Sequence, residues 1–138
     1  MSGVVRMPYV DRDPSRPGTS LMPYAPVSFL LGAVALVEHA LLDTGAAVNV
    51  LPWRTGVALG FDWNALASDV NLSGNLANAP AKIVALRVQL GALPPTRLAF
   101  AWTKSDAVPV LLGQVNFFSE FDVCFHRKQG YFEVRARG

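Results

Sequence analysis

From residue 27 to the C-terminus, short apolar runs alternate with clusters of Gly, Pro, Asn and Ser. Apolar or alternating runs bounded by such turn residues are typical of β-strands. Residues 83–90 are the clearest case, because the polar Arg87 and Gln89 fall on one face and apolar residues on the other. The predicted strands cover residues 27–31, 33–37, 40–42, 48–51, 83–90, 98–102, 108–112, 122–125 and 131–134.

A few segments favour other local structure. The predicted helical turns are residues 55–59, which end before Gly60, residues 62–67 and residues 114–121. Residues 73–80 contain Gly, Asn and Pro and predict a hairpin. The pattern as a whole therefore predicts a mostly β domain with one or two short helices and no internal repeat.

Residues 1–24 differ in composition from the rest of the chain. Prolines at positions 8, 14, 17 and 23 argue against regular elements there. We therefore divide the chain into an extended Pro- and Arg-rich arm at residues 1–24, ordered at most in part against the body, and one domain at residues 25–138. A chain of 138 residues is long enough to bury a core.

Composition raises the question of a membrane. Hydrophobic residues make up 51% of the chain, charged residues 16%, and the mean hydropathy is +0.30. The uncharged stretch at residues 25–37 is shorter than the roughly 20 residues of a spanning helix. Acidic and basic residues between positions 11 and 16 exclude a secretory signal peptide there. We therefore expect a soluble, cytoplasmic protein without a membrane partner, which buries its excess apolar surface against a second copy of itself.

The formal charge is +2 and the sequence pI is about 9.0. Basic residues near the C-terminus leave a nucleic-acid partner open, but they are scattered and lack an aromatic stacking platform, so a solvated face is the better interpretation. The single Cys124 cannot form an intrachain disulfide and is expected to be a small buried hydrophobe. With two histidines far apart in sequence, His39 and His126, the case for a zinc site is weak.

One tripeptide carries the candidate chemistry. Asp43-Thr44-Gly45 follows an apolar run, so the carboxylate is expected to enter a restricted, partly dry space. The threonine hydroxyl can hydrogen-bond to backbone, and the glycine lacks the Cβ that would block a close approach. The motif occurs once, and a similar apolar pair followed by glycine recurs about 70 residues later, at residues 111–113. Two carboxylates would therefore require two chains.

These residues resemble the retropepsin-type aspartic proteases, the single-domain family of retroviral proteases and their cellular relatives. Residues 40–46 are similar to the active-site strand and loop of that family, and Leu111-Leu112-Gly113 with a short helix behind it resembles the element that braces this loop. The segments around residues 121–123 and 130–132 resemble the last hairpin of pepsin-like lobes. The resemblance spans residues 27–134 and implies a closed or partly open β-barrel of the acid protease fold.

The resemblance also implies a function and a set of roles. Asp43 would pair with the same residue of a second chain, and the two carboxylates would activate one water for hydrolysis of a peptide bond, with no metal or organic cofactor. Thr44 would lock the two loops together across the dimer axis, and Gly45 would keep its backbone near the substrate. The implied substrate-binding residues are Ala46, Ala47 and, in a flap within residues 71–82, Gly74 and Asn75.

Two departures from the family keep an alternative open. Retroviral members commonly carry an acidic residue two positions after the motif glycine, where this chain has Ala47, and the flap has only Gly74 near its tip. Both departures favour a catalytically weak, dimeric peptide-binding or scaffolding module. The intact Asp43-Thr44-Gly45 favours the enzyme, because pure binding has no use for a buried pair of carboxylates. The three tryptophans, at positions 53, 63 and 102, are expected in the core or in a pocket wall.

Overall fold

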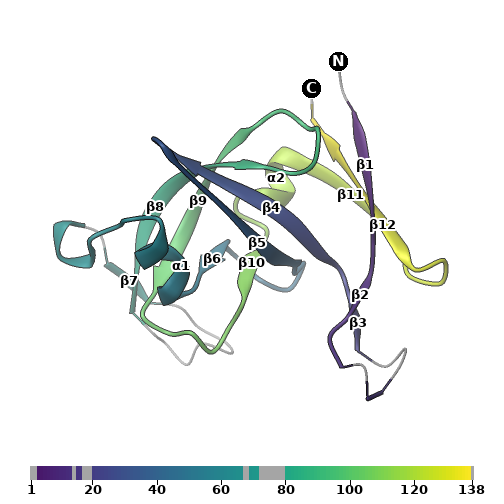
Figure 1. Ribbon diagram of the computed structural model, residues 1–138, viewed down its shortest axis with the longest axis horizontal. Coiled ribbons are helices and arrows are strands. Elements are labelled where there is room, and N and C mark those ends of the chain that lie inside the picture. The colour runs from purple at the N-terminus through teal and green to yellow at the C-terminus, as the bar shows by residue number, and fades with distance from the viewer. Residues whose placement is uncertain (1–2, 14, 17–19, 67–68, 72–79, 138) are drawn as a thin grey trace.

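The computed structural model describes residues 3–13, 15–16, 20–66, 69–71 and 80–137. Most of these residues are in β-strands (Figure 1). The strands are β1 (Val4–Pro8), β2 (Val10–Asp11), β3 (Leu21–Met22), β4 (Tyr24–Leu31), β5 (Val34–Leu42), β6 (Val50–Leu51), β7 (Asp69–Asn71), β8 (Pro80–Gln89), β9 (Thr96–Thr103), β10 (Val110–Leu112), β11 (Phe121–His126) and β12 (Tyr131–Ala136). The helices are α1 (Trp53–Ala58), the 3-10 turn η1 (Trp63–Ala65) and α2 (Phe117–Glu120).

Within the described residues, six strands close into a barrel in the order β4–β5–β10–β6–β9–β8, and β8 returns to β4. Most neighbours are antiparallel, but β10 runs parallel to β5 and β6 runs parallel to β9. The closing contact pairs residues 28–30 of β4 with residues 87–89 of β8. The prediction of a mostly β, closed barrel with short helices is therefore confirmed.

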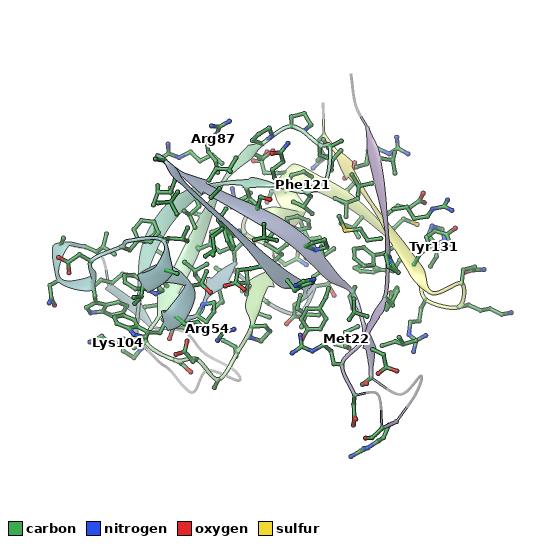
Figure 2. The ribbon with its side chains drawn as sticks, in the orientation of Figure 1. Met22, Arg54, Arg87, Lys104, Phe121 and Tyr131 are labelled. Carbon is green, nitrogen blue, oxygen red and sulfur yellow. The ribbon has the colours of Figure 1, made fainter. Side chains whose placement is uncertain are left out.

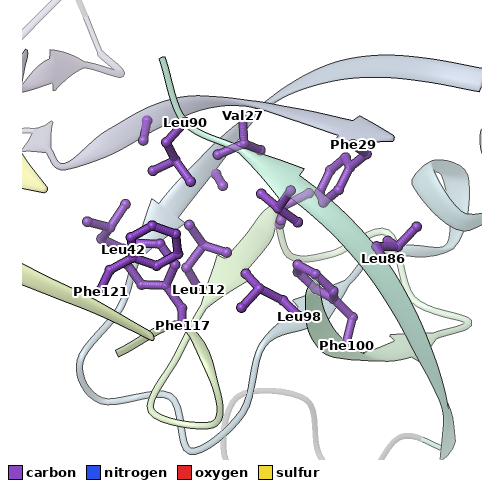
Figure 3. Packing of buried hydrophobic residues seen from close by; sticks show 14 of the residues in the cluster. Val27, Phe29, Leu42, Leu86, Leu90, Leu98, Phe100, Leu112, Phe117 and Phe121 are labelled. Carbon is purple, nitrogen blue, oxygen red and sulfur yellow. The ribbon is translucent and has the colours of Figure 1, made fainter. Parts of the chain in front are cut away.

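The barrel encloses the main hydrophobic core. Along β8 and the first half of β9 the side chains largely alternate, so that one face is buried and the other faces outward, whereas residues 100–103 of β9 are buried on both faces. Figure 3 shows Phe29, Leu86, Leu98 and Phe100 from three different strands packed together in this interior. Trp102 is also fully buried, and α1 packs so closely on it that a Cβ on Gly56 would overlap its indole ring.

A second, smaller sheet joins the two ends of the chain. Strand β1 pairs antiparallel with β12, and β12 pairs with β11 (Figure 1). On its outer face, Arg6 Nη2 donates to Glu133 Oε2 at 3.3 Å, His126 Nε2 lies 3.2 Å from Glu133 Oε1, and Arg6 stacks 4.1 Å from the Tyr131 ring centroid. The arm therefore contains regular structure that its prolines argued against. Pro8 is tolerated because it ends an edge strand, where a missing N–H breaks no ladder.

Three other local expectations were wrong. Residues 40–42 do not form a separate strand but continue β5, since β4 pairs without a break with residues 34–41. The helix expected at 114–121 is confined to four residues, because the chain before it is held in a loop. Cys124 is exposed rather than buried, because it pairs with Glu133 on the outward face of β11 while Phe121 faces the core. Among the helices in the described part of the chain, none is long and apolar enough to cross a membrane.

Candidate active site

Asp43 lies directly after β5, at the point where that strand leaves the barrel. The preceding Leu42 is buried in the core, whereas Asp43 itself is partly exposed. The Asp43 backbone N–H donates to Leu112 O at 2.9 Å, and its carboxylate Oδ1 accepts from Gly45 N–H at 3.0 Å. The carboxylate is therefore held at the turn by its own motif.

The other two motif residues have distinct surroundings. A Cβ on Gly45 would stand 3.3 Å from Asp43 Oδ1, so any larger residue would crowd the carboxylate. Thr44 is exposed, and its backbone oxygen accepts from Gln114 Nε2 at 2.9 Å. Within the described part of this single chain, the Thr44 hydroxyl makes no hydrogen bond. A second chain could therefore use this hydroxyl without breaking an existing contact.

The apolar pair and glycine that begin the second predicted loop do lie beside the first. Leu111 and Leu112 on β10 pair with Leu41 and Leu42 in parallel register. A Cβ on Gly113 would overlap Val48 O and would lie 2.7 Å from Ala46 O. Only glycine permits this approach of the two backbones.

Backbone hydrogen bonds join the two loops along their whole length. Gln114 N–H donates to Ala46 O and Val115 N–H donates to Ala47 O, each at 2.9 Å, and Asn49 N–H returns a bond to Val115 O at 2.8 Å. Behind them, Leu42 and Leu112 lie against Phe117 and Phe121, whose rings stack 4.9 Å apart (Figure 3). The loop that carries Asp43 is therefore held from one side by hydrogen bonds and from behind by the core.

Asn49, which the sequence pattern did not single out, is the polar residue that joins this assembly. Its side chain is 0% exposed. Oδ1 accepts from Gly113 N–H at 2.8 Å, and Nδ2 donates to Ala99 O at 3.0 Å and to Asn116 Oδ1 at 3.2 Å. Asn116 Oδ1 also accepts from Ala99 N–H at 3.0 Å. One asparagine therefore connects both loops to β9; its only sequence signal is a lone polar residue between Val48 and Val50.

A small apolar cluster lies on the outward face of the sheet beside the two loops. Val50, Ala81 and Ala101 are buried there, and Val48, Val108 and Leu111 pack on them while remaining partly exposed. These side chains are short or branched and carry no polar atoms, so the surface is apolar. Trp102, by contrast, belongs to the interior, with Trp53 stacked on it at 4.8 Å between ring centroids.

The other predicted site residues lie on the loop after the motif and in the expected flap. Ala46 is partly buried and Ala47 is exposed on that loop. Strand β7 pairs antiparallel with the first residues of β8, so the two stems of a hairpin are present, but Gly74 and Asn75 lie outside the described residues. In the described part of the chain, no group of three or more His, Cys, Asp or Glu side chains is arranged to hold a metal ion.

The chain has the fold of the retropepsin-like aspartic proteases. A retropepsin-like aspartic protease from Rickettsia conorii superposes with a TM-score of 0.63 at 18% identity, covering 99% of this chain and 94% of that one. The retroviral protease-like domain of Ddi1 from Leishmania major superposes with a TM-score of 0.52 at 15% identity, covering 73% of this chain and 79% of that one. No family model and no curated protein matches the sequence.

Proposed function

We propose that this protein is an aspartic endopeptidase that acts as a homodimer. The observation that carries the proposal is the braced loop of Asp43, which presents one partly exposed carboxylate at the end of a barrel strand. The retropepsin-like fold supports it, because the proteins that share this fold include a protease. A single carboxylate per chain leaves the site incomplete until a second copy supplies the other.

In the proposed dimer, Asp43 of each chain faces its counterpart around one water. Two carboxylates a few ångströms apart cannot both ionise without a large electrostatic cost, so they share a proton. The ionised member accepts a proton from the water, which attacks the scissile carbonyl, and the protonated member donates to the carbonyl oxygen. The two groups titrate as a unit. The N–H of Gly45, which already donates to Asp43, would hold one carboxylate oxygen in place through this exchange.

The surroundings of the loop suit an extended peptide. A strand-like substrate can add main-chain hydrogen bonds at the site, while adjoining surfaces choose its side chains. The small apolar cluster around Val50 and Leu111 would contact aliphatic side chains, and the hairpin that begins with β7 would cover the peptide. The side chain of Ala47 is a methyl group without a hydrogen-bonding atom. At that position the substrate would therefore meet only the backbone and an apolar contact.

The first test is the Asp43→Asn variant with a diverse peptide library. We expect the cleavage rate at mildly acid pH to fall by about 10⁴-fold or more, because the amide cannot act as a general base. Asp62→Asn is the matched control, since Asp62 only caps η1 by accepting from Asn64 N–H and an asparagine can keep that bond. Equal cleavage by wild type and Asp43→Asn would exclude the assignment.

The second test separates the enzyme from a peptide-binding module. For a dimeric enzyme, specific activity should fall on dilution below the dimer dissociation constant, as followed by sedimentation velocity at the same concentrations. A module without catalysis would bind library peptides with equal affinity as wild type and as Asp43→Asn, and would cleave none. Constant specific activity in a range where only monomer sediments would defeat the dimer.

A further inference from the structure

The end of the barrel farthest from Asp43 carries an unusual surface. The β4–β5 hairpin turns there through Gly32, which has a left-handed φ of 58° and open space where a Cβ would stand. Val34, which pairs with Leu31 beside the turn, is 41% exposed, and Val37, three residues further along on the other face of β5, is 64% exposed. Exposed apolar side chains concentrated at one tip are a common mark of an interaction site. The strand β5, at about 3.3 Å per residue, puts this tip roughly 30 Å from the catalytic loop.

Two arginines lie beside this tip. Leu30 of β4 pairs with Arg87 of β8, and Arg87 pairs with Arg97 of β9. The neighbouring Phe29 and Val88 point into the core, so both arginines point outward, and both are exposed. Figure 2 shows Arg87 at the far end of the hairpin. We call the exposed and partly exposed residues of this region the hairpin-end patch: Leu30, Val34, Ala35, Val37, Arg87 and Arg97.

The arginines have no acidic counterpart among the residues that the structure describes. Like charges directly opposite each other on adjacent strands destabilise a sheet. Neither guanidinium makes an ion pair or hydrogen bond with any residue that the structure describes. Residues 28–37, 86–89 and 96–98, which pair at this end of the barrel, contain no Asp or Glu. The positive charge is therefore local and unneutralised within the described chain, and it suits an anionic partner.

We propose that the hairpin-end patch binds the surface of a membrane that contains anionic lipids. The exposed valines would enter the interfacial region while the arginines contact lipid headgroups, each contributing attraction near a negatively charged leaflet. A second copy of this chain is a poorer occupant, because a symmetric contact through the patch would bring four unneutralised arginines together. The prediction of no membrane partner rested on the lack of a spanning segment, but a peripheral contact requires no such segment.

The charge contribution is tested by binding to vesicles of phosphatidylcholine with and without phosphatidylserine. We expect wild type to bind only the anionic vesicles, and Arg87→Gln/Arg97→Gln to bind about thirty-fold more weakly. Lys128→Gln/Arg135→Gln is the matched control: it lowers the formal charge from +2 to 0 as well, but it changes residues of the terminal hairpin. No binding by wild type, or equal losses in the two double variants, would overturn the proposal.

The orientation is tested with an environment-sensitive fluorophore on cysteine. In wild type the label reports from the exposed Cys124, and in Val34→Cys/Cys124→Ser it reports from the hairpin tip. Anionic vesicles should shift the emission to shorter wavelength from position 34 and leave it unchanged from position 124. A shift from position 124 alone would place the contact elsewhere. Self-association of wild type that Val34→Ser/Val37→Ser abolishes, without vesicle binding, would identify a second copy as the occupant instead.

Discussion

The two ends of strand β5 differ in how strongly the surrounding structure fixes them. At the Leu42 end, β10 joins the sheet, Asp43 bonds to Leu112 O, and the buried Asn49 side chain ties the neighbouring loop to β9. At the Val34 end, the chain turns through two residues into β4, with exposed side chains around it. Backbone position is over-determined at one end and set by a single turn at the other.

Because of this difference, the two ends of β5 should tolerate amino-acid substitutions to different degrees. A buried loop pair whose polar groups are all bonded to one another loses several interactions when one member changes. No buried side-chain nitrogen or oxygen in the described residues lacks a hydrogen-bond partner. At the Leu42 end there is therefore no spare donor or acceptor to replace one that a substitution removes. Among the described residues, the Val34 end has no buried polar side chain that a substitution could leave without a partner. Substitutions at the Leu42 end should therefore lower the free energy of unfolding by more than substitutions at the Val34 end.

The largest expected effect is that of Gly113→Ala. The new methyl group would overlap Val48 O and approach Ala46 O, both backbone atoms of the loop that carries Asp43, so the two loops must separate. We expect the free energy of unfolding to fall by about 3 kcal/mol or more, with loss of peptide cleavage. Chemical denaturation and the library assay measure the two quantities. Wild-type stability in this variant would show that the loops are not held in the close approach described.

Asn49→Ala is the next test of the over-determined end. It would leave Gly113 N–H without its acceptor and remove the donor to Ala99 O, at a site with no access to water. Unsatisfied buried groups of this kind cost about 1–3 kcal/mol each, so we expect a loss of about 2–4 kcal/mol on denaturant unfolding. Asn64→Ala, on an exposed residue of η1, should stay within about 0.5 kcal/mol of wild type. Equal losses in both variants would contradict the role assigned to Asn49.

The same contrast explains how much of the structure the sequence could predict. Local signals are sufficient for the central strands, because β8 and the first half of β9 alternate in side-chain character and the pleat turns that alternation into burial. The sequence was also sufficient to place Asp43 beside residues 111–113, because the Asp-Thr-Gly motif and its spacing to Leu111-Leu112-Gly113 resemble those of a known family. The fold could be predicted to the level of a barrel with short helices, and the site to the level of its two loops.

Long-range pairing accounts for most of what was missed. Strand β1 forms only because β12, more than 120 residues later, offers an edge, and no local pattern encodes that partner. Asn49 is an isolated polar residue in an apolar run, and its partners come from β9 and from the loop around residue 113. The apolar neighbours of Cys124 favour a place in the core, although strand alternation puts it on the opposite face.

Gly32→Ala tests the other end of β5. The added Cβ would meet nothing within 4 Å, so the cost comes only from the left-handed φ of 58°. That conformation costs a non-glycine residue about 1–2 kcal/mol, so we expect a loss of that size and unchanged cleavage. Gly32→Asn should lose less, because asparagine adopts this conformation more readily. A loss of cleavage by Gly32→Ala with the fold retained would mean that the two ends of β5 are coupled.

The smallest expected effect lies in the terminal sheet, away from both ends of β5. Burial acts to raise the pKa of Glu133, but hydrogen bonds and charges from Arg6 and His126 outweigh it, so the pKa lies below its ordinary value. A lowered pKa in the folded state adds stability at neutral pH, and that contribution is lost as the pH falls through the carboxyl range. Glu133→Gln should therefore flatten the acid limb of stability against pH, measured by thermal unfolding. Glu120→Gln, an exposed carboxylate without an ion pair in the described residues, is the control that should keep the wild-type slope. An unchanged slope in Glu133→Gln would show that these side-chain contacts do not contribute to the acid dependence, and that the pairing of β1 with β12 rests on the backbone ladder.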